Sequence, residues 1–297
     1  MASLIIKDNM NKKTITIIFA LAAMCGGASA QQKQGHVMRP KPRGVGKTTV
    51  VGQAQLEVEY AWNATDLRNP DTYLDLHVLR AGTQLSKHYS RFLERGDSLF
   101  DAYMKANPNA EGVPSTFYTI GREGQYWSEY QSTEIFTESG QQTFYAWMPW
   151  AMERYNAYYT EPAAQQKWTL TNERKTILGH QCQKATTHWR GRDFEAWFAT
   201  DIPVRLGPWS FGGLPGLIVK ISDAKQEYNF ELVKLERTPR PIMQWNFSRF
   251  RKVKRQDMLK LQKKININWL TVLYGGRVTS LEGNTFPDKP YSPMELE

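Results

Sequence analysis

The sequence predicts an α+β protein that is mainly β, with a strongly curved, half-barrel-like antiparallel sheet and a few covering helices. Short segments with strand-like alternation recur along the chain, separated by turn residues, which is typical of a meander. Strands do not alternate with helices as they do in parallel α/β folds. The 297 residues include ten tryptophans and fourteen tyrosines, and such residues pack half-buried sheet faces and line grooves.

The first thirty residues have the pattern of a signal peptide. A basic start at residues 10–13 precedes an apolar run over 15–23, and residues 28–30 supply the small side chains of a cleavage site. We expect translation to begin at Met10. The apolar run is too short to span a membrane, and the bulky Met24 before Cys25 argues against a lipoprotein anchor. The pattern predicts an exported protein of the periplasm or cell surface.

Composition divides the remaining chain into two parts. Residues 31–49 are polar, basic and broken by proline and glycine, which predicts a disordered lead-in. Residues 50–297 form one β-rich domain, long enough to bury a large core. Loss of Cys25 with the signal peptide leaves Cys182 as the only thiol, so no internal disulfide can form.

The predicted domain begins with strands and one helix. Alternation places Ala54, Leu56 and Val58 on one side of the first strand. Apolar spacing over residues 90–106 predicts a helix that ends before Asn107-Pro108. Further strands are expected over residues 72–79, 84–89, 116–120, 133–137, 143–148, 168–171, 175–178, 181–189, 193–200, 217–222 and 227–235.

The end of the chain is basic. After Pro239 and Pro241, lysines and arginines alternate with apolar residues at roughly helical spacing, which predicts an amphipathic helix near 249–264. Such a helix could contact an anionic membrane surface or an acidic partner, although a solvated face is the commoner explanation. Residues 290–296 are expected to form an extended tail docked on the domain.

The run from Phe211 to Ile218 predicts a packed turn. Pro215 suits the second position of a type II turn, and Gly216 could supply the positive φ that the third position requires. Apolar residues on both sides indicate that the turn is buried.

One strand carries possible metal ligands. Alternation places His180, Cys182 and His188 on one side of the predicted strand 181–189, where they could contribute to a copper or zinc site. A stable site needs three or four ligands. The simpler interpretation makes Cys182 a buried apolar residue and leaves the histidines hydrogen-bonded, so we expect no cofactor.

Evidence for catalysis is weak. Arg190 and Arg192 flank a predicted hairpin turn and could bind a carboxylate or phosphate, or simply solvate the turn. Glu195 and Asp201 are the nearby acids, and nothing shows that they converge into an acid–base pair. The usual nucleophile, zinc-protease and nucleotide motifs are absent from the sequence. An enzyme is therefore not favoured.

Residues 168–235 resemble the GLPGLI family, exported proteins found mainly in Bacteroidetes and without an assigned biochemical function. The resemblance rests on residues 175–179, Cys182, 184–185, 190–192, 196–198, 201–203, 207–208 and the motif at 213–218. It implies a periplasmic or surface location and a β-rich fold.

These observations lead to one expected function and two alternatives. The expected function is non-catalytic: an envelope protein that binds an apolar ligand or an outer-membrane partner. Its groove is expected at Arg190, Arg192, Trp197, Gly213, Leu214, Pro215, Gly216 and Leu217. The alternatives are a thiol or metal protein centred on Cys182, and an enzyme whose site gathers Glu195, Asp201, Arg190 or His188. Nucleic acid is not an expected partner of an exported protein.

Overall fold

The computed structural model describes residues 15–17, 43, 47–114, 117, 127–276, 278–280, 283 and 285–297. The chain forms two compact units, one of residues 1–37 and 256–293 and one of residues 38–255 and 294–297. The predicted signal peptide and lead-in lie outside the described residues, apart from 15–17, 43 and 47–49. The strand expected at 116–120 also lies outside them, apart from residue 117.

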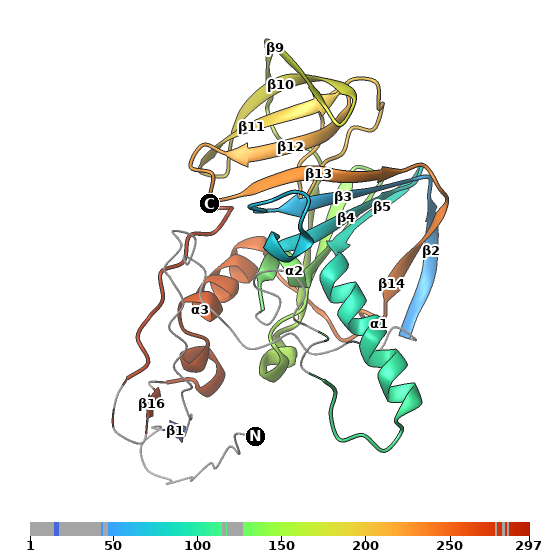
Figure 1. The fold of residues 1–297 in the computed structure, drawn as a ribbon. Coiled ribbons are helices and arrows are strands. Elements are labelled where there is room, and N and C mark those ends of the chain that lie inside the picture. Colours follow the sequence, from blue (N-terminus) through green and yellow to red (C-terminus); the bar gives the residue numbers. More distant parts are fainter. Residues whose placement is uncertain are drawn as a thin grey trace. The chain divides into compact units, whose positions relative to one another are not determined.

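The larger unit contains one sheet of twelve described strands, in the order β15-β8-β7-β6-β5-β4-β3-β13-β12-β11-β10-β9 (Figure 1). Neighbours are antiparallel except for β15, which pairs with β8 in parallel. The strands are β3 Leu56–Trp62, β4 Asp75–Ala81, β5 Leu85–Ser90, β6 Thr133–Glu138, β7 Gln141–Ala146, β8 Ala157–Pro162, β9 Thr169–Ile177, β10 His180–Trp189, β11 Arg192–Ala199, β12 Leu217–Asp223, β13 Asn229–Glu236 and β15 Arg251–Lys252. The prediction of a mainly β fold is confirmed.

Two helices and two 3-10 helices accompany this sheet among the elements that can be described in full. They are α1 Arg91–Ala106, α2 Glu129–Ser132, η2 Pro70–Thr72 and η4 Trp150–Tyr155. Ser90 ends β5 and also caps α1, because its side chain accepts a hydrogen bond from the backbone N–H of Leu93 at 3.1 Å. The predicted helix at 90–106 is therefore placed to within a residue.

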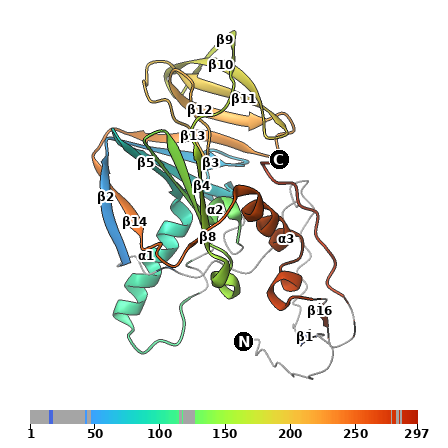
Figure 2. The same cartoon turned by 180° about the vertical axis from the view of Figure 1, so that it is seen from behind.

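A separate two-stranded ribbon pairs β2 Thr48–Ala54 with β14 Arg240–Trp245. Figure 1 and, from behind, Figure 2 show the two strands running side by side. Each faces a single partner, and Pro241 fits β14 because an edge strand can leave one side without a donor. No strand was predicted over residues 240–245, so β14 was missed.

One face of the sheet forms an aromatic core. The ring of Trp62 packs edge-on against Tyr130 at 5.5 Å between centroids and stacks on Phe230 at 5.9 Å. Register places Tyr60 beside His77 and Trp62 beside Asp75 on this face. The core therefore encloses two ionisable side chains, His77 and Asp75, with no exposed surface.

The smaller unit contains most of α3 Arg255–Tyr274 and a parallel pair of short strands, β1 Ile15–Ile17 and β16 Val278–Ser280. Leu270 and Val278 form its buried cluster, against which Trp269, Tyr274 and Phe286 pack. The helix expected at 249–264 instead begins at Arg255, after β15, and extends ten residues further. No helix in the described residues is long and apolar enough to cross a membrane.

Candidate functional site

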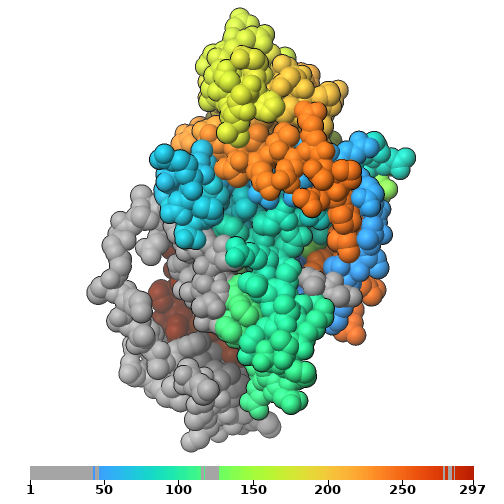
Figure 3. All heavy atoms as spheres, turned by 45° about the vertical axis from the view of Figure 1, so that its right-hand side comes forward, coloured from blue at the N-terminus to red at the C-terminus, as the bar shows by residue number. Residues whose placement is uncertain are grey.

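An open groove with a volume of about 460 Å³ lies where the ribbon meets the sheet. That volume falls within the roughly 300–1,000 Å³ usual for small-molecule sites. Its lining comes from β7, β8, the ribbon and the segment after β14: Lys47, Thr49, Tyr145, Tyr158, Gln244, Trp245, Asn246, Phe247 and Ser248. Figure 3 shows the ribbon strands, blue and orange, at the right of the larger unit.

Three rings form one side of this groove. Tyr145 of β7 and Tyr158 of β8 are paired in register, so their side chains project from the same face, with centroids 5.3 Å apart. Phe247 stacks on Tyr145 at 3.8 Å with an interplanar angle of 7°. Phe250 fixes this arrangement from behind, edge-on to Phe247 at 4.9 Å.

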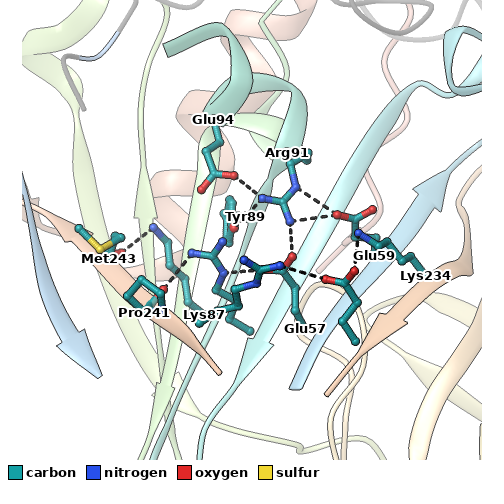
Figure 4. A network of polar contacts seen from close by, with 12 residues as sticks. Glu57, Glu59, Lys87, Tyr89, Arg91, Glu94, Lys234, Pro241 and Met243 are labelled. Atoms are coloured by element: carbon teal, nitrogen blue, oxygen red, sulfur yellow. Dashed lines mark hydrogen bonds and ion pairs between the residues drawn. The ribbon is translucent and has the colours of Figure 1, made fainter. Parts of the chain in front are cut away.

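A polar network holds the ribbon against the sheet (Figure 4). Lys87 of β5 donates to the carbonyl of Met243 at 2.8 Å, and Arg80 of β4 donates to the carbonyl of Pro241 at 2.9 Å. Both acceptors belong to β14. The sheet thereby places the groove residues that follow Met243.

The same network continues to Glu57, which accepts from both Arg80 and Arg91 at 2.6 Å. Burial alone would raise the pKa of Glu57, but the two guanidinium groups lower it below its ordinary value. The carboxylate therefore stays ionised and keeps Arg80 aimed at the ribbon.

Arg43 supports the groove from beneath. Its guanidinium lies over the rings of Trp147 and Trp245, at 5.2 and 5.0 Å from their centroids. It also forms ion pairs with Asp97 at 2.8 Å and Glu134 at 2.6 Å. Trp245 is thus held by a cation that is itself fixed by two buried carboxylates.

The lining combines aromatic rings, neutral hydrogen-bonding groups and one ammonium group, that of Lys47. Burial, with a smaller contribution from Tyr158, raises the pKa of Tyr145, so its phenol stays protonated and can donate. Gln244 and Asn246 supply amide donors and acceptors, and Thr49 and Ser248 supply hydroxyls. Among the described residues that line the groove, none carries a carboxylate. The described lining therefore offers aromatic rings and hydrogen-bonding groups to a ligand.

The suggested metal ligands do not come together. His180 and His188 begin and nearly end β10, and each ring bonds a different aspartate, Asp201 at 2.7 Å and Asp193 at 2.6 Å. Cys182 is 1% exposed, and burial raises the pKa of its thiol. Within the described residues, no group of three or more His, Cys, Asp or Glu could hold a metal ion.

Arg190 and Arg192 are both held in ion pairs. Arg190 contacts Glu161 at 2.7 Å and Glu295 at 2.6 Å. Arg192 is buried and contacts Asp223 at 2.9 Å and Glu227 at 2.8 Å. These guanidinium groups stabilise the fold at the β10–β11 turn and the chain end.

The polar side chains proposed for a noncontiguous active site are also dispersed. Glu195 pairs with Lys184 at 2.7 Å, whereas Asp201 pairs with His180. Neither pair includes Arg190 or His188. The structure therefore does not assemble that alternative site.

The remaining predicted groove residues serve packing. Trp197 is buried, with the ammonium of Lys175 4.0 Å above its ring. Leu214 and Leu217 are core residues, and Pro215 is exposed. Trp168 donates its indole N–H to the carbonyl of Gly212 at 2.8 Å, which fixes the start of the motif. None of these residues lines the groove on the ribbon.

The prediction of a type II turn at Pro215-Gly216 is wrong. Gly216 does not have a positive φ; that conformation belongs to Gly213, with φ of 89°. A glycine is needed at 216 for space, because an added Cβ would clash with the carbonyl oxygen of Ala199 and lie 2.8 Å from its carbonyl carbon. Close approach of β11, not backbone conformation, excludes a side chain there.

Sequence reasoning missed the groove because its two sides come from distant segments. A local signal was present: in Gln244-Trp245-Asn246-Phe247-Ser248, aromatic residues alternate with amides and a hydroxyl. Because β14 was not predicted, this alternation could not be assigned to the end of a strand.

Comparison with known proteins finds a match for part of this chain. Residues 151–262 match the family model described as the N-terminal domain of N-glycanase peptide. Two solved structures of PNGF-II, in space groups P21 and C2, are 13% and 14% identical with TM-scores of 0.41 and 0.43. Each match covers 71% of this chain and 34% of the other, so this chain spans about a third of their length. No curated protein matches the sequence.

This match corrects the resemblance to the GLPGLI family. The residues that carried that resemblance, 168–235, lie inside the segment matched by the N-glycanase model, and no GLPGLI match is found. It also overturns the expected function of a non-catalytic envelope protein for an apolar ligand, because the model that matches belongs to an enzyme family.

Proposed function

We propose that this chain takes part in the removal of N-linked glycans, as an N-glycanase-type domain that holds the carbohydrate of the glycoprotein. The observation that carries the proposal is the overlap between the groove and the N-glycanase match. Six lining residues fall within 151–262: Tyr158, Gln244, Trp245, Asn246, Phe247 and Ser248.

The chemistry of the groove suits a saccharide. A sugar ring presents C–H faces that pack on aromatic rings, and hydroxyls that exchange hydrogen bonds with amides and phenols. Tyr158 and Trp245 supply such rings, and Asn246 and Gln244 supply the amides. The absence of a carboxylate from the described lining assigns substrate holding, not bond cleavage, to this groove.

The strongly curved, half-barrel-like sheet belongs to the same proposal. β8 and β10 are distant in the order of the twelve strands, yet Arg190, just after β10, contacts Glu161 of β8 at 2.7 Å. This contact supports a sheet that bends back on itself. We also propose export of the protein, which the signal-peptide pattern in residues 1–30 supports.

Titration with an asparagine-linked neutral biantennary glycopeptide tests the proposal. Isothermal calorimetry should detect binding of the glycopeptide and none of the same peptide without glycan. Tyr158→Ala should raise Kd about tenfold, equivalent to about 1.4 kcal/mol, because it removes a ring from the groove.

Trp150→Ala is the matched control, because Trp150 is 58% exposed and lies outside the lining. It should bind as the unaltered protein does, and circular dichroism should show that both variants fold. Failure of the unaltered protein to bind the glycopeptide at millimolar concentration would overturn the proposal.

A further inference from the structure

The groove has a cationic rim. Lys47 belongs to its lining, and Arg249 directly follows the lining residue Ser248. Lys252 of β15 is in register with Tyr158 of β8, so both side chains project from the same face. All three basic residues are exposed.

These cations differ from the others around the ribbon. Arg43, Arg80, Lys87 and Arg91 each contact at least one carboxylate. Among the described residues, by contrast, no carboxylate lies within ion-pairing distance of Lys47, Arg249 or Lys252. The described lining carries no acid either. The positive charge at the rim is therefore uncompensated by the described side chains.

We propose that the groove selects anionic saccharides, namely glycans that carry a carboxylate or a sulfate. This inference rests on the proposed function and names its substrate class. Rings and amides contact the neutral part of the glycan, and the rim ammonium and guanidinium groups attract its charge. Because the rim is exposed, each charge contributes modestly and salt screens it.

The placement of the basic residues favours a saccharide over a membrane surface. Lys47 lines the groove, and Lys252 is in register with the lining residue Tyr158, so two different segments bring a basic residue to one hollow. A flat lipid surface needs no such groove. Anionic vesicles therefore enter the test as a competitor.

The test compares three glycopeptides that share one peptide and one biantennary core, ending in galactose, sialic acid or sulfated galactose. At low salt, the two anionic forms should bind about tenfold more tightly than the neutral form. Raising sodium chloride to about 1 M, where the Debye length falls to about 3 Å, should remove most of that difference. Tighter binding of only one of the two anionic glycopeptides would identify its charged group, the carboxylate or the sulfate, as the group that is recognised.

The double variant Arg249→Gln/Lys252→Gln should lose most of the anionic preference and keep neutral binding, because neither residue belongs to the lining of the groove. Lys225→Gln, an exposed lysine in the β12–β13 turn, is the control and should keep both. Equal affinity for neutral and anionic forms would overturn the inference while leaving the groove intact as a glycan site. Absence of binding by all three would overturn the proposed function itself. Displacement of the glycopeptide by vesicles of anionic phospholipid would also overturn the inference.

Discussion

Gly216 lies against the backbone of β11, where the chain leaves no room for a Cβ atom. The carbonyl of Ala199 fills the position, and the ring of Phe198 lies 3.3 Å from where a Cβ would be. Backbone atoms cannot turn away as a flexible side chain can. The sequence correctly indicated that glycine is required here, but the physical reason depends on a strand contact that no local pattern encodes.

Gly216→Ala should therefore lower the free energy of unfolding by about 1–3 kcal/mol, as overpacking does. Urea denaturation followed by tryptophan fluorescence measures the change. Gly112→Ala provides the control, because no atom lies within 4 Å of its added Cβ, and it should shift stability by less than about 0.5 kcal/mol. Equal stability of the two variants would show that Gly216 is not crowded.

The core also holds a pair of stacked histidines, His77 and His88, with ring centroids 4.8 Å apart. Burial lowers the pKa of His88 to about 3 and lowers that of His77 well below its ordinary value. Burial raises the pKa of Asp75 to about 7. Both imidazoles are therefore neutral near pH 7, whereas the carboxyl of Asp75 is about half protonated there.

His88 makes stability depend on pH with a defined sign. Between pH 3 and 6.5 the unfolded chain binds a proton at this position and the folded chain does not, so acidification favours unfolding. Asp75 acts in the opposite direction, because its proton is retained in the folded state up to about pH 7. The contribution of His88 to the free energy of unfolding is therefore lost progressively as pH falls from 6.5 toward 3.

Replacing His88 with Phe should reduce the slope of unfolding free energy against pH by about 1.4 kcal/mol per pH unit between pH 4 and 6. Urea titrations at several pH values measure this slope. An unchanged slope in a folded His88→Phe variant would show that His88 is already protonated in the native core.

At the scale of elements, the β2–β14 ribbon depends on buried ion pairs. Lys87 contacts Glu134 at 2.7 Å, and both side chains are almost fully buried. Burial alone would raise the pKa of Glu134, but Lys87 and Arg43 lower it below its ordinary value. Removing one cation would leave a buried carboxylate partly uncompensated.

Lys87→Met should lower the free energy of unfolding by about 3–5 kcal/mol, the usual cost of breaking a buried pair. Lys234→Met is the matched control: Lys234 pairs with Glu236, but its side chain is 49% exposed, and loss of such a pair costs roughly 0–1 kcal/mol. Thermal and urea unfolding compare the two. Similar losses of unfolding free energy in the two variants would show that burial does not strengthen the Lys87–Glu134 pair.

At the scale of the whole molecule, the sequence predicted the type of fold and many of its elements. It did not predict which residues from distant segments come together. Strand alternation placed Ala54, Leu56 and Val58 on one side of the first predicted strand, and all three are buried. The helix after β5 was also placed well, since its capping serine and apolar spacing are local. The groove could not be predicted, because Thr49, Tyr145 and Trp245 meet only after the ribbon docks on the sheet.

The proposed curvature of the sheet predicts energetic coupling between its distant strands. Arg190→Met and Glu161→Gln should each destabilise the protein, and the double variant should lose less than the sum. A coupling energy of about 1 kcal/mol or more is expected for contacting residues. Additive effects within about 0.3–0.5 kcal/mol would show that the two strands are not held together.

Hydrogen exchange with and without the neutral N-linked glycopeptide tests the central claim most directly, because it locates the ligand on the chain. We expect slower amide exchange in peptides containing Tyr145, Tyr158 and residues 244–248, with no change in peptides from β9 to β11. Protection confined to β9–β11, or to the residues around Gly216, would show that the ribbon groove is not where the glycan binds.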